Sequence, residues 1–81
     1  MNVDNLVKMA NRIGNFFEAM PDRDQALADI ATHIRKFWEP RMRRDLLTHL
    51  RNGGADLTPL VVAALERYQS LLAESTEQET A

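Results

Sequence analysis

The chain has 81 residues, no cysteine and a formal net charge of −2. A chain of this length forms one domain, and the lack of cysteine excludes a disulfide framework and a thiolate metal site. No apolar run approaches the ~18 residues that a membrane span needs, and the N-terminus does not have the pattern of a secretory signal. We therefore expect a single cytoplasmic domain.

The charges are distributed unevenly along the chain. Residues 35–51 carry six lysines and arginines against two acidic residues, whereas the last eight residues carry three glutamates and no cation. A basic centre favours an acidic partner surface or an anionic group. The mild overall charge argues against a dedicated nucleic-acid binder, which usually has a high pI.

The first predicted helix runs from Val3 to about residue 19, with Asn2 as its N-cap. Its apolar residues recur every three or four positions, which predicts one buried stripe. The stripe comprises Val3, Leu6, Met9, Ala10, Ile13, Phe16, Phe17 and Met20. Asn11 and Asn15 lie on another face and are interpreted as a solvated flank, with a polar docking face as the alternative. Pro21 ends this helix.

The second predicted helix spans residues 23–38, with Asp22 as its cap. Its apolar stripe comprises Ala26, Leu27, Ile30, Ala31, Ile34, Phe37 and Trp38. Pro40 ends this helix and starts a third one over residues 40–51, because the fixed φ of proline suits a first helical turn. Only Glu39 separates the two helices, so we expect either a sharp corner or a kink in one longer helix.

Glycines and a Thr-Pro pair mark the last predicted elements. Asn52–Gly53–Gly54 ends the third helix, since glycine accepts the left-handed conformation of a helix C-terminus. Thr58 as N-cap and Pro59 as first residue start a fourth helix that continues to about Ala73. Residues 74–81 contain no large apolar side chain and are expected to form a disordered acidic tail.

These elements predict an all-α fold over residues 1–73. It is a small bundle of three to four helices with a proline-marked corner between helices two and three. The sequence contains no strand alternation, internal repeat or glycine-rich phosphate loop. Nothing in it predicts an enzyme active site within this chain.

The segment His33–Arg44, HIRKFWEPRMRR, is the strongest candidate for a functional surface. It combines the only tryptophan with a dense run of cations, and Trp and Arg are the residues most enriched at binding hot spots. We interpret it as a protein-docking surface, with a solvated charged face as the alternative. The predicted centre is Trp38, Pro40, Arg41, Met42 and Arg44, flanked by Arg35, Phe37 and Arg43. Adjacent helical positions diverge by ~100°, so we expect one of the two aromatics to face the interior.

Catalysis and metal binding find little support. His33 and His49 are 16 residues apart on different predicted helices. We interpret His33 as a partly buried histidine bonded to a backbone group, and His49 as a solvated residue near a helix C-terminus. No catalytic, cofactor-binding or metal-ligating residue is predicted.

A nucleic-acid-binding regulator is the alternative function. Helices two and three resemble a helix-turn-helix, in which Arg35, Arg41 and Arg44 would contact phosphates. The motif needs three or four residues between its helices, however, and only Glu39 is present. We therefore prefer the docking interpretation.

Three stretches of the chain resemble a known family. LVKMANRIGNFFEAMP (residues 6–21), HIRKFWEPRMRRDL (33–46) and LTPLVVAALERY (57–68) are similar to the delta subunit of NAD-dependent, molybdenum-containing formate dehydrogenase. The resemblance covers about residues 3–70. FWEPRM is its most specific piece, and the acidic tail lies outside the pattern.

The resemblance implies a role in an oxidoreductase complex. That complex interconverts formate and carbon dioxide and carries bis-molybdopterin guanine dinucleotide, iron–sulfur clusters, FMN and NAD. The delta subunit is expected to be a helical accessory protein without a redox centre. It would bind the alpha subunit, and through it the beta and gamma subunits, and support assembly, stability or cofactor insertion. No nucleic acid or membrane is expected as a partner.

Overall fold

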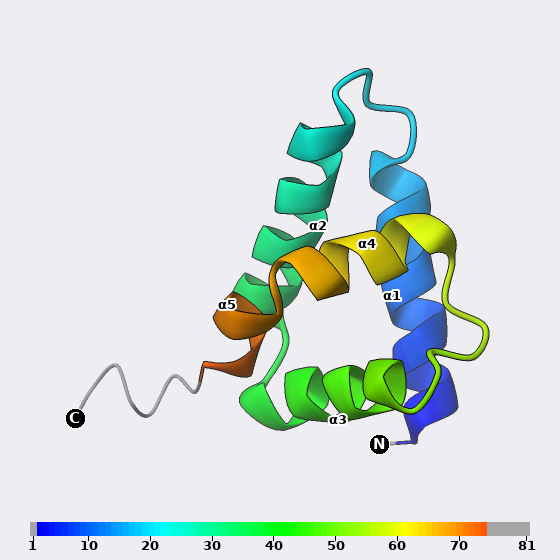
Figure 1. The fold of residues 1–81 in the computed structure, drawn as a ribbon, viewed down its shortest axis with the longest axis vertical. Coiled ribbons are helices and arrows are strands. Elements are labelled where there is room, and N and C mark those ends of the chain that lie inside the picture. The colour runs from blue at the N-terminus through cyan, green and yellow to red at the C-terminus, as the bar shows by residue number, and fades with distance from the viewer. Residues whose placement is uncertain (1, 75–81) are drawn as a thin grey trace.

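The computed structural model describes residues 2–74 and shows an all-helical fold. Its elements are α1 (Val3–Phe17), α2 (Arg23–Phe37), α3 (Pro40–Arg51), α4 (Pro59–Arg67) and α5 (Gln69–Ala73). The first two helices stand side by side as an antiparallel hairpin, and α3 runs across the end where α1 begins and α2 finishes (Figure 1). The predicted small helical bundle is therefore confirmed.

The starts of the first two helices follow from their capping residues. The side chain of Asn2 accepts a hydrogen bond from the backbone N–H of Asn5 at 3.0 Å, and Asp22 accepts one from the N–H of Gln25 at 3.2 Å. Each bond satisfies a donor that has no partner within the helix. Both caps agree with the prediction, and α1 and α2 end within two residues of their predicted ends.

The joint between α2 and α3 is a sharp corner. Trp38 and Glu39 both have extended backbone conformations, with φ/ψ of −94°/142° and −66°/152°. Pro40 is the first residue of α3, where its missing N–H costs nothing. Two extended residues interrupt the helical path completely, which excludes a kink in one longer helix.

Two glycines close α3 as predicted. Gly53 and Gly54 have φ of +112° and +63°, conformations that side chains disfavour. Their N–H groups donate to the carbonyls of Leu50 at 3.1 Å and His49 at 2.9 Å. This is the Schellman arrangement, which satisfies carbonyls at the end of the helix. The chain can therefore reverse at once toward α4.

The fourth predicted helix is broken, so the prediction of one continuous helix to Ala73 is wrong. Tyr68, with φ/ψ of −113°/27°, separates α4 from α5. The break redirects the chain, because α4 packs mainly on α2 whereas α5 packs mainly on α3. No glycine or proline lies near residue 68, so tertiary packing and not a local breaker ends α4.

The predicted acidic tail is described only at its first residue. Glu74 follows α5 and contacts two arginines, as shown below. It therefore belongs to the folded unit and not to a tail. The other seven residues of the predicted tail lie outside the described residues.

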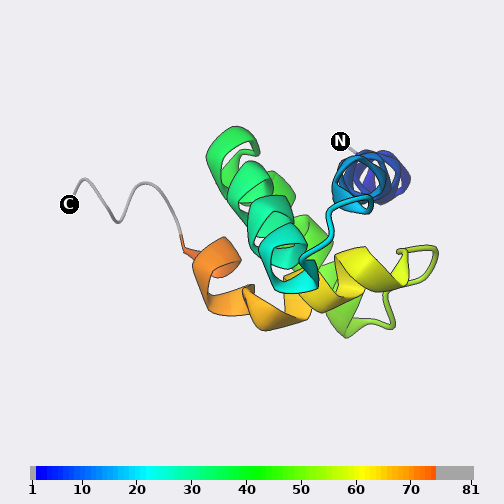
Figure 2. The same cartoon turned by 90° about the horizontal axis from the view of Figure 1, so that it is seen from above.

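The core lies where the five helices meet. Its buried residues are Leu6, Ala10, Leu27, Ile30, Ile34, Trp38, Leu46, Leu47, Val61, Ala64, Leu65 and Leu72. Figure 2 shows α4 and α5 on one face of the α1–α2 hairpin. The close approach of α1 to α4 depends on Gly14, where a Cβ atom would lie 2.6 Å from the Cγ2 of Val61.

An exposed ion pair also links α4 to α2. The guanidinium of Arg67 donates to the carboxylate of Asp24 at 2.9 Å. This hydrogen bond and the carboxylate charge raise the pKa of Arg67. Because both groups are exposed, the pair adds little stability. Among the described residues, no helix is both long and apolar enough to cross a bilayer.

Candidate protein-docking site

The eight residues predicted for docking differ in their exposure. Phe37, Arg41 and Arg44 are exposed, Arg35, Pro40 and Met42 are half-buried, and Trp38 and Arg43 are buried. Only 6% of Trp38 and 1% of Arg43 is accessible to solvent. The fold buries Arg43, which was expected to flank the docking surface, and leaves only a small part of Trp38 accessible. Docking by the eight residues stays a prediction.

The two adjacent aromatics at the end of α2 point in different directions. Trp38 belongs to the core cluster, whereas Phe37 is 66% exposed. The ring of Phe37 rests 4.8 Å from the His33 ring, centroid to centroid, and the Lys36 Nζ lies 5.6 Å from its centroid. One aromatic thus serves the interior, as the helical geometry predicted, and the exposed one is Phe37.

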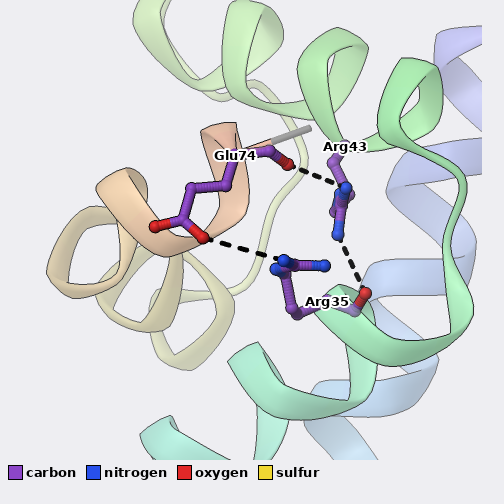
Figure 3. A network of polar contacts seen from close by, with 3 residues as sticks. All are labelled: Arg35, Arg43 and Glu74. Atoms are coloured by element: carbon purple, nitrogen blue, oxygen red, sulfur yellow. Dashed lines mark hydrogen bonds and ion pairs between the residues drawn. The ribbon is translucent and has the colours of Figure 1, made fainter. Parts of the chain in front are cut away.

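Arg43 joins three helices in the interior. From α3, its Nη1 donates to the backbone carbonyl of Arg35 at 2.8 Å, and its Nη2 donates to that of Glu74 at 2.9 Å (Figure 3). The guanidinium of Arg35 in turn lies 3.7 Å from the Glu74 carboxylate. Arg43 therefore ties the end of α2 to the end of α5.

The physical role of this network follows from helix geometry. The last carbonyl groups of a helix find no N–H donor within that helix. Arg35 lies in the last turn of α2, so its carbonyl needs a donor from elsewhere. A cation near the negative end of a helix dipole is favourable. We conclude that Arg43 is a structural residue, which agrees with its nearly complete burial.

The nucleic-acid interpretation is weakened by the same network. Arg35 is half-buried and paired with Glu74. Of the three arginines that would contact phosphates, only Arg41 and Arg44 are exposed. Two exposed cations beside acidic Asp45 make a weak electrostatic surface for a polyanion.

Two further polar residues fasten the loop between α3 and α4. The Asn11 amide donates to the carbonyl of Asp56 at 2.8 Å and accepts from the N–H of Thr58 at 3.0 Å. The Nε2 of His49 lies 2.8 Å from the carbonyl of Ala55. Asn11 and His49 therefore hold this loop in place, a role that their interpretation as solvated residues did not include.

An apolar groove lies between α1 and the C-terminal half of α2. It has a volume of about 390 Å³ and is lined by Met9, Arg12, Ile13, Phe16, Phe17, His33 and Trp38. Phe16 is 79% exposed, and its ring contacts that of Phe17 edge to face with 5.0 Å between centroids. Trp38, which was expected on the docking face, contributes to the lining of this groove.

A second hollow adjoins the first. It has a volume of about 260 Å³, shares Phe17 and His33 with the groove, and is otherwise lined by Asp29, Thr32, Lys36 and Phe37. We refer to the two hollows together as the aromatic groove. It is bordered on α1 by the exposed Phe16 and on α2 by the exposed Phe37.

The sequence reasoning missed most of this groove. It assigned Met9, Ile13 and Phe16 to a buried stripe, but the first two are half-buried and Phe16 is exposed. Positions 6, 9, 10, 13, 16 and 17 span about 120° of the helix circumference at 100° per residue. This is an ordinary width for a buried stripe, so the sequence carried no signal that part of it is exposed.

The groove carries no metal-binding cluster among the described residues. Among residues 2–74, no three histidine, cysteine or acidic side chains are grouped so that they could hold a metal ion. The fold and the site define a small helical domain with an exposed aromatic groove. Such a surface is typical of contact with another macromolecule.

Comparison with known families identifies the chain more closely. It belongs to the FdsD family, the delta subunit of NADH-dependent formate dehydrogenase, whose pattern matches residues 5–65. That match includes every residue that lines the aromatic groove. No curated protein and no solved structure matches the chain significantly. Membership of this family implies association with other subunits of a formate dehydrogenase complex.

Proposed function

We propose that the chain is a non-catalytic accessory subunit that docks on the molybdopterin-containing alpha subunit of NAD-dependent formate dehydrogenase. Through the alpha subunit it would join the beta and gamma subunits in the cytoplasm. Its role there is to support the assembly, stability or cofactor insertion of the alpha subunit. The family match over residues 5–65 carries this proposal.

Two properties of the chain support the proposal. The absence of cysteine leaves no thiolate ligand for an iron–sulfur cluster. The exposed Phe16 and Phe37 offer apolar area of the kind that protein interfaces cover. In this proposal, bis-molybdopterin guanine dinucleotide, the iron–sulfur clusters, FMN and NAD are held by other subunits.

The test is to purify the formate dehydrogenase complex from cells that make this chain and from cells in which its gene is deleted. The measurements are molybdenum per alpha subunit, subunit composition and formate oxidation rate. Loss of molybdenum without this chain indicates a role in cofactor insertion. Full molybdenum with dissociating subunits indicates a stabilising role. An unchanged complex on all three measurements would refute the proposal.

A further inference from the structure

The aromatic groove lies on a side of α1 that the rest of the fold leaves open. Gly14 marks the side of α1 that contacts α4, because a Cβ there would meet Val61. At 100° per residue, Met9, Ile13 and Phe16 are turned from Gly14 by roughly 100–160°. The α1–α2 hairpin is therefore covered by α4 on one side and carries the groove on another.

An exposed aromatic side chain borders the groove on each of its two helices. Phe16 on α1 and Phe37 on α2 are the most exposed large apolar side chains of the described residues, at 79% and 66%. Their rings are steadied by Phe17 and His33, with centroids at 5.0 and 4.8 Å. The two exposed rings can insert into pockets of a partner, and the hollow beside them can accept a side chain of that partner. Hot spots at protein interfaces pair in this way.

The charges around the groove are mainly positive. Arg12 lines the larger hollow and Lys36 the smaller one, and both residues are exposed. The carboxylate of Asp29, the acidic residue that lines the smaller hollow, accepts a hydrogen bond from the Gln25 amide at 2.8 Å. A partner that presents carboxylates beside an apolar stripe would complement this arrangement.

We propose that the aromatic groove binds an amphipathic helix of another formate dehydrogenase subunit. The apolar stripe of that helix would fill the hollow between α1 and α2, and its aspartate or glutamate side chains would meet Arg12 and Lys36. A helix fits because two neighbouring helices offer a groove parallel to their axes, and a third helix buries it. The inference rests on the proposed function, since it names the surface through which the subunit docks.

Photo-crosslinking tests the position of the interface. The probe p-benzoylphenylalanine replaces Phe16 or Phe37 in this chain, and Arg51, exposed at the end of α3, is the control position. Each chain is added to formate dehydrogenase complex purified without it, irradiated, and digested for mass spectrometry. We expect crosslinks from positions 16 and 37 to one helical, Asp- or Glu-containing peptide of another subunit, and none to that peptide from position 51.

Matched charge reversals test the chemistry of the partner. Arg12→Glu with Lys36→Glu changes the charge as much as Arg23→Glu with Arg51→Glu, whose residues are exposed and do not line the groove. We expect the first pair to raise the dissociation constant at least about 10-fold and to weaken its salt dependence. The second pair should change it less than about 2-fold.

The possible outcomes separate the two proposals. If the unmodified chain does not bind the complex, the proposed function fails. If it binds but positions 16 and 37 crosslink to nothing, to a second copy of this chain or to nucleic acid, only the groove inference is refuted. Equal effects of the two charge reversals would also refute it. Phe16→Ser, with an unchanged circular dichroism spectrum and weaker binding, would support it independently of crosslinking.

Discussion

Replacing Arg43 with methionine is expected to destabilise the fold strongly, although the residue lies in a segment that looks like a charged surface. Methionine has a similar length and fills irregular space well, so the change removes the hydrogen bonds with little loss of volume. It leaves the carbonyls of Arg35 and Glu74 without the donors that reach them at 2.8 and 2.9 Å. The ends of α2 and α5 lose their connection through α3.

The size of the effect can be worked from these contacts. Hydrogen bonds from a charged donor contribute about 1.5–3 kcal/mol each, so two of them contribute about 3–6 kcal/mol. Relief of the cost of burying a charge offsets part of this loss. We therefore expect a decrease of about 3 kcal/mol in the free energy of unfolding. The total free energy of unfolding of a domain of 81 residues is roughly 4–12 kcal/mol, so this loss is a large fraction of the stability.

Urea denaturation followed by tryptophan fluorescence measures this change directly. Trp38 is the only tryptophan and is 6% exposed, so its emission reports the loss of the core. With a slope near 1 kcal/mol per molar urea, Arg43→Met should lower the midpoint by roughly 3 M. The control is Arg44→Met, an exposed neighbour on the same helix, which should change stability by less than about 0.5 kcal/mol.

Equal midpoints for Arg43→Met and Arg44→Met would refute the structural role of the buried guanidinium. Arg43→Lys provides a further check on the mechanism. Lysine keeps the charge but has no planar fork to reach two carbonyls. The lysine variant should therefore fall between the wild type and Arg43→Met, and a wild-type midpoint would show that charge alone suffices.

Three further substitutions test other contacts. Gly14→Ala should cost about 1–3 kcal/mol through overpacking, and adding Val61→Ala should recover part of it in urea titrations; no recovery would rule out the clash at 2.6 Å. Asn11→Ala should lower the free energy of unfolding by about 1–3 kcal/mol and speed hydrogen exchange of the Thr58 amide. Unchanged exchange would contradict the role of Asn11 in holding the loop. Phe16→Ser should change stability by less than about 0.5 kcal/mol, and a larger loss would mean that its ring belongs to the core.

The local structure of the first three helices could be predicted from the sequence. Asn2, Asp22 and Pro40 act on the residues directly next to them, through a side-chain cap or a fixed φ. The glycines after α3 likewise act locally, since only their own φ angles permit the turn. Signals of this kind depend on a few adjacent residues, so they can be interpreted from the sequence without the tertiary structure.

The candidate site could be predicted only in part. The sequence indicated a docking surface around residues 35–44, and Phe37, Arg41 and Arg44 are indeed exposed there. It did not indicate that Phe16, 21 positions earlier, lies across a groove from that segment. Periodicity identifies which residues share a helix face, but the neighbouring helices decide how much of that face is covered.

Composition, caps and spacing by themselves determined a small all-α domain, three of its helices and the corner at Pro40. Tertiary structure decided the rest: the break at Tyr68, the burial of Trp38 and Arg43, and the exposure of Phe16. The physical reason is that each of these depends on contacts between segments far apart in the chain. Arg43 shows this best, because its buried position requires the carbonyl of Glu74, 31 residues away.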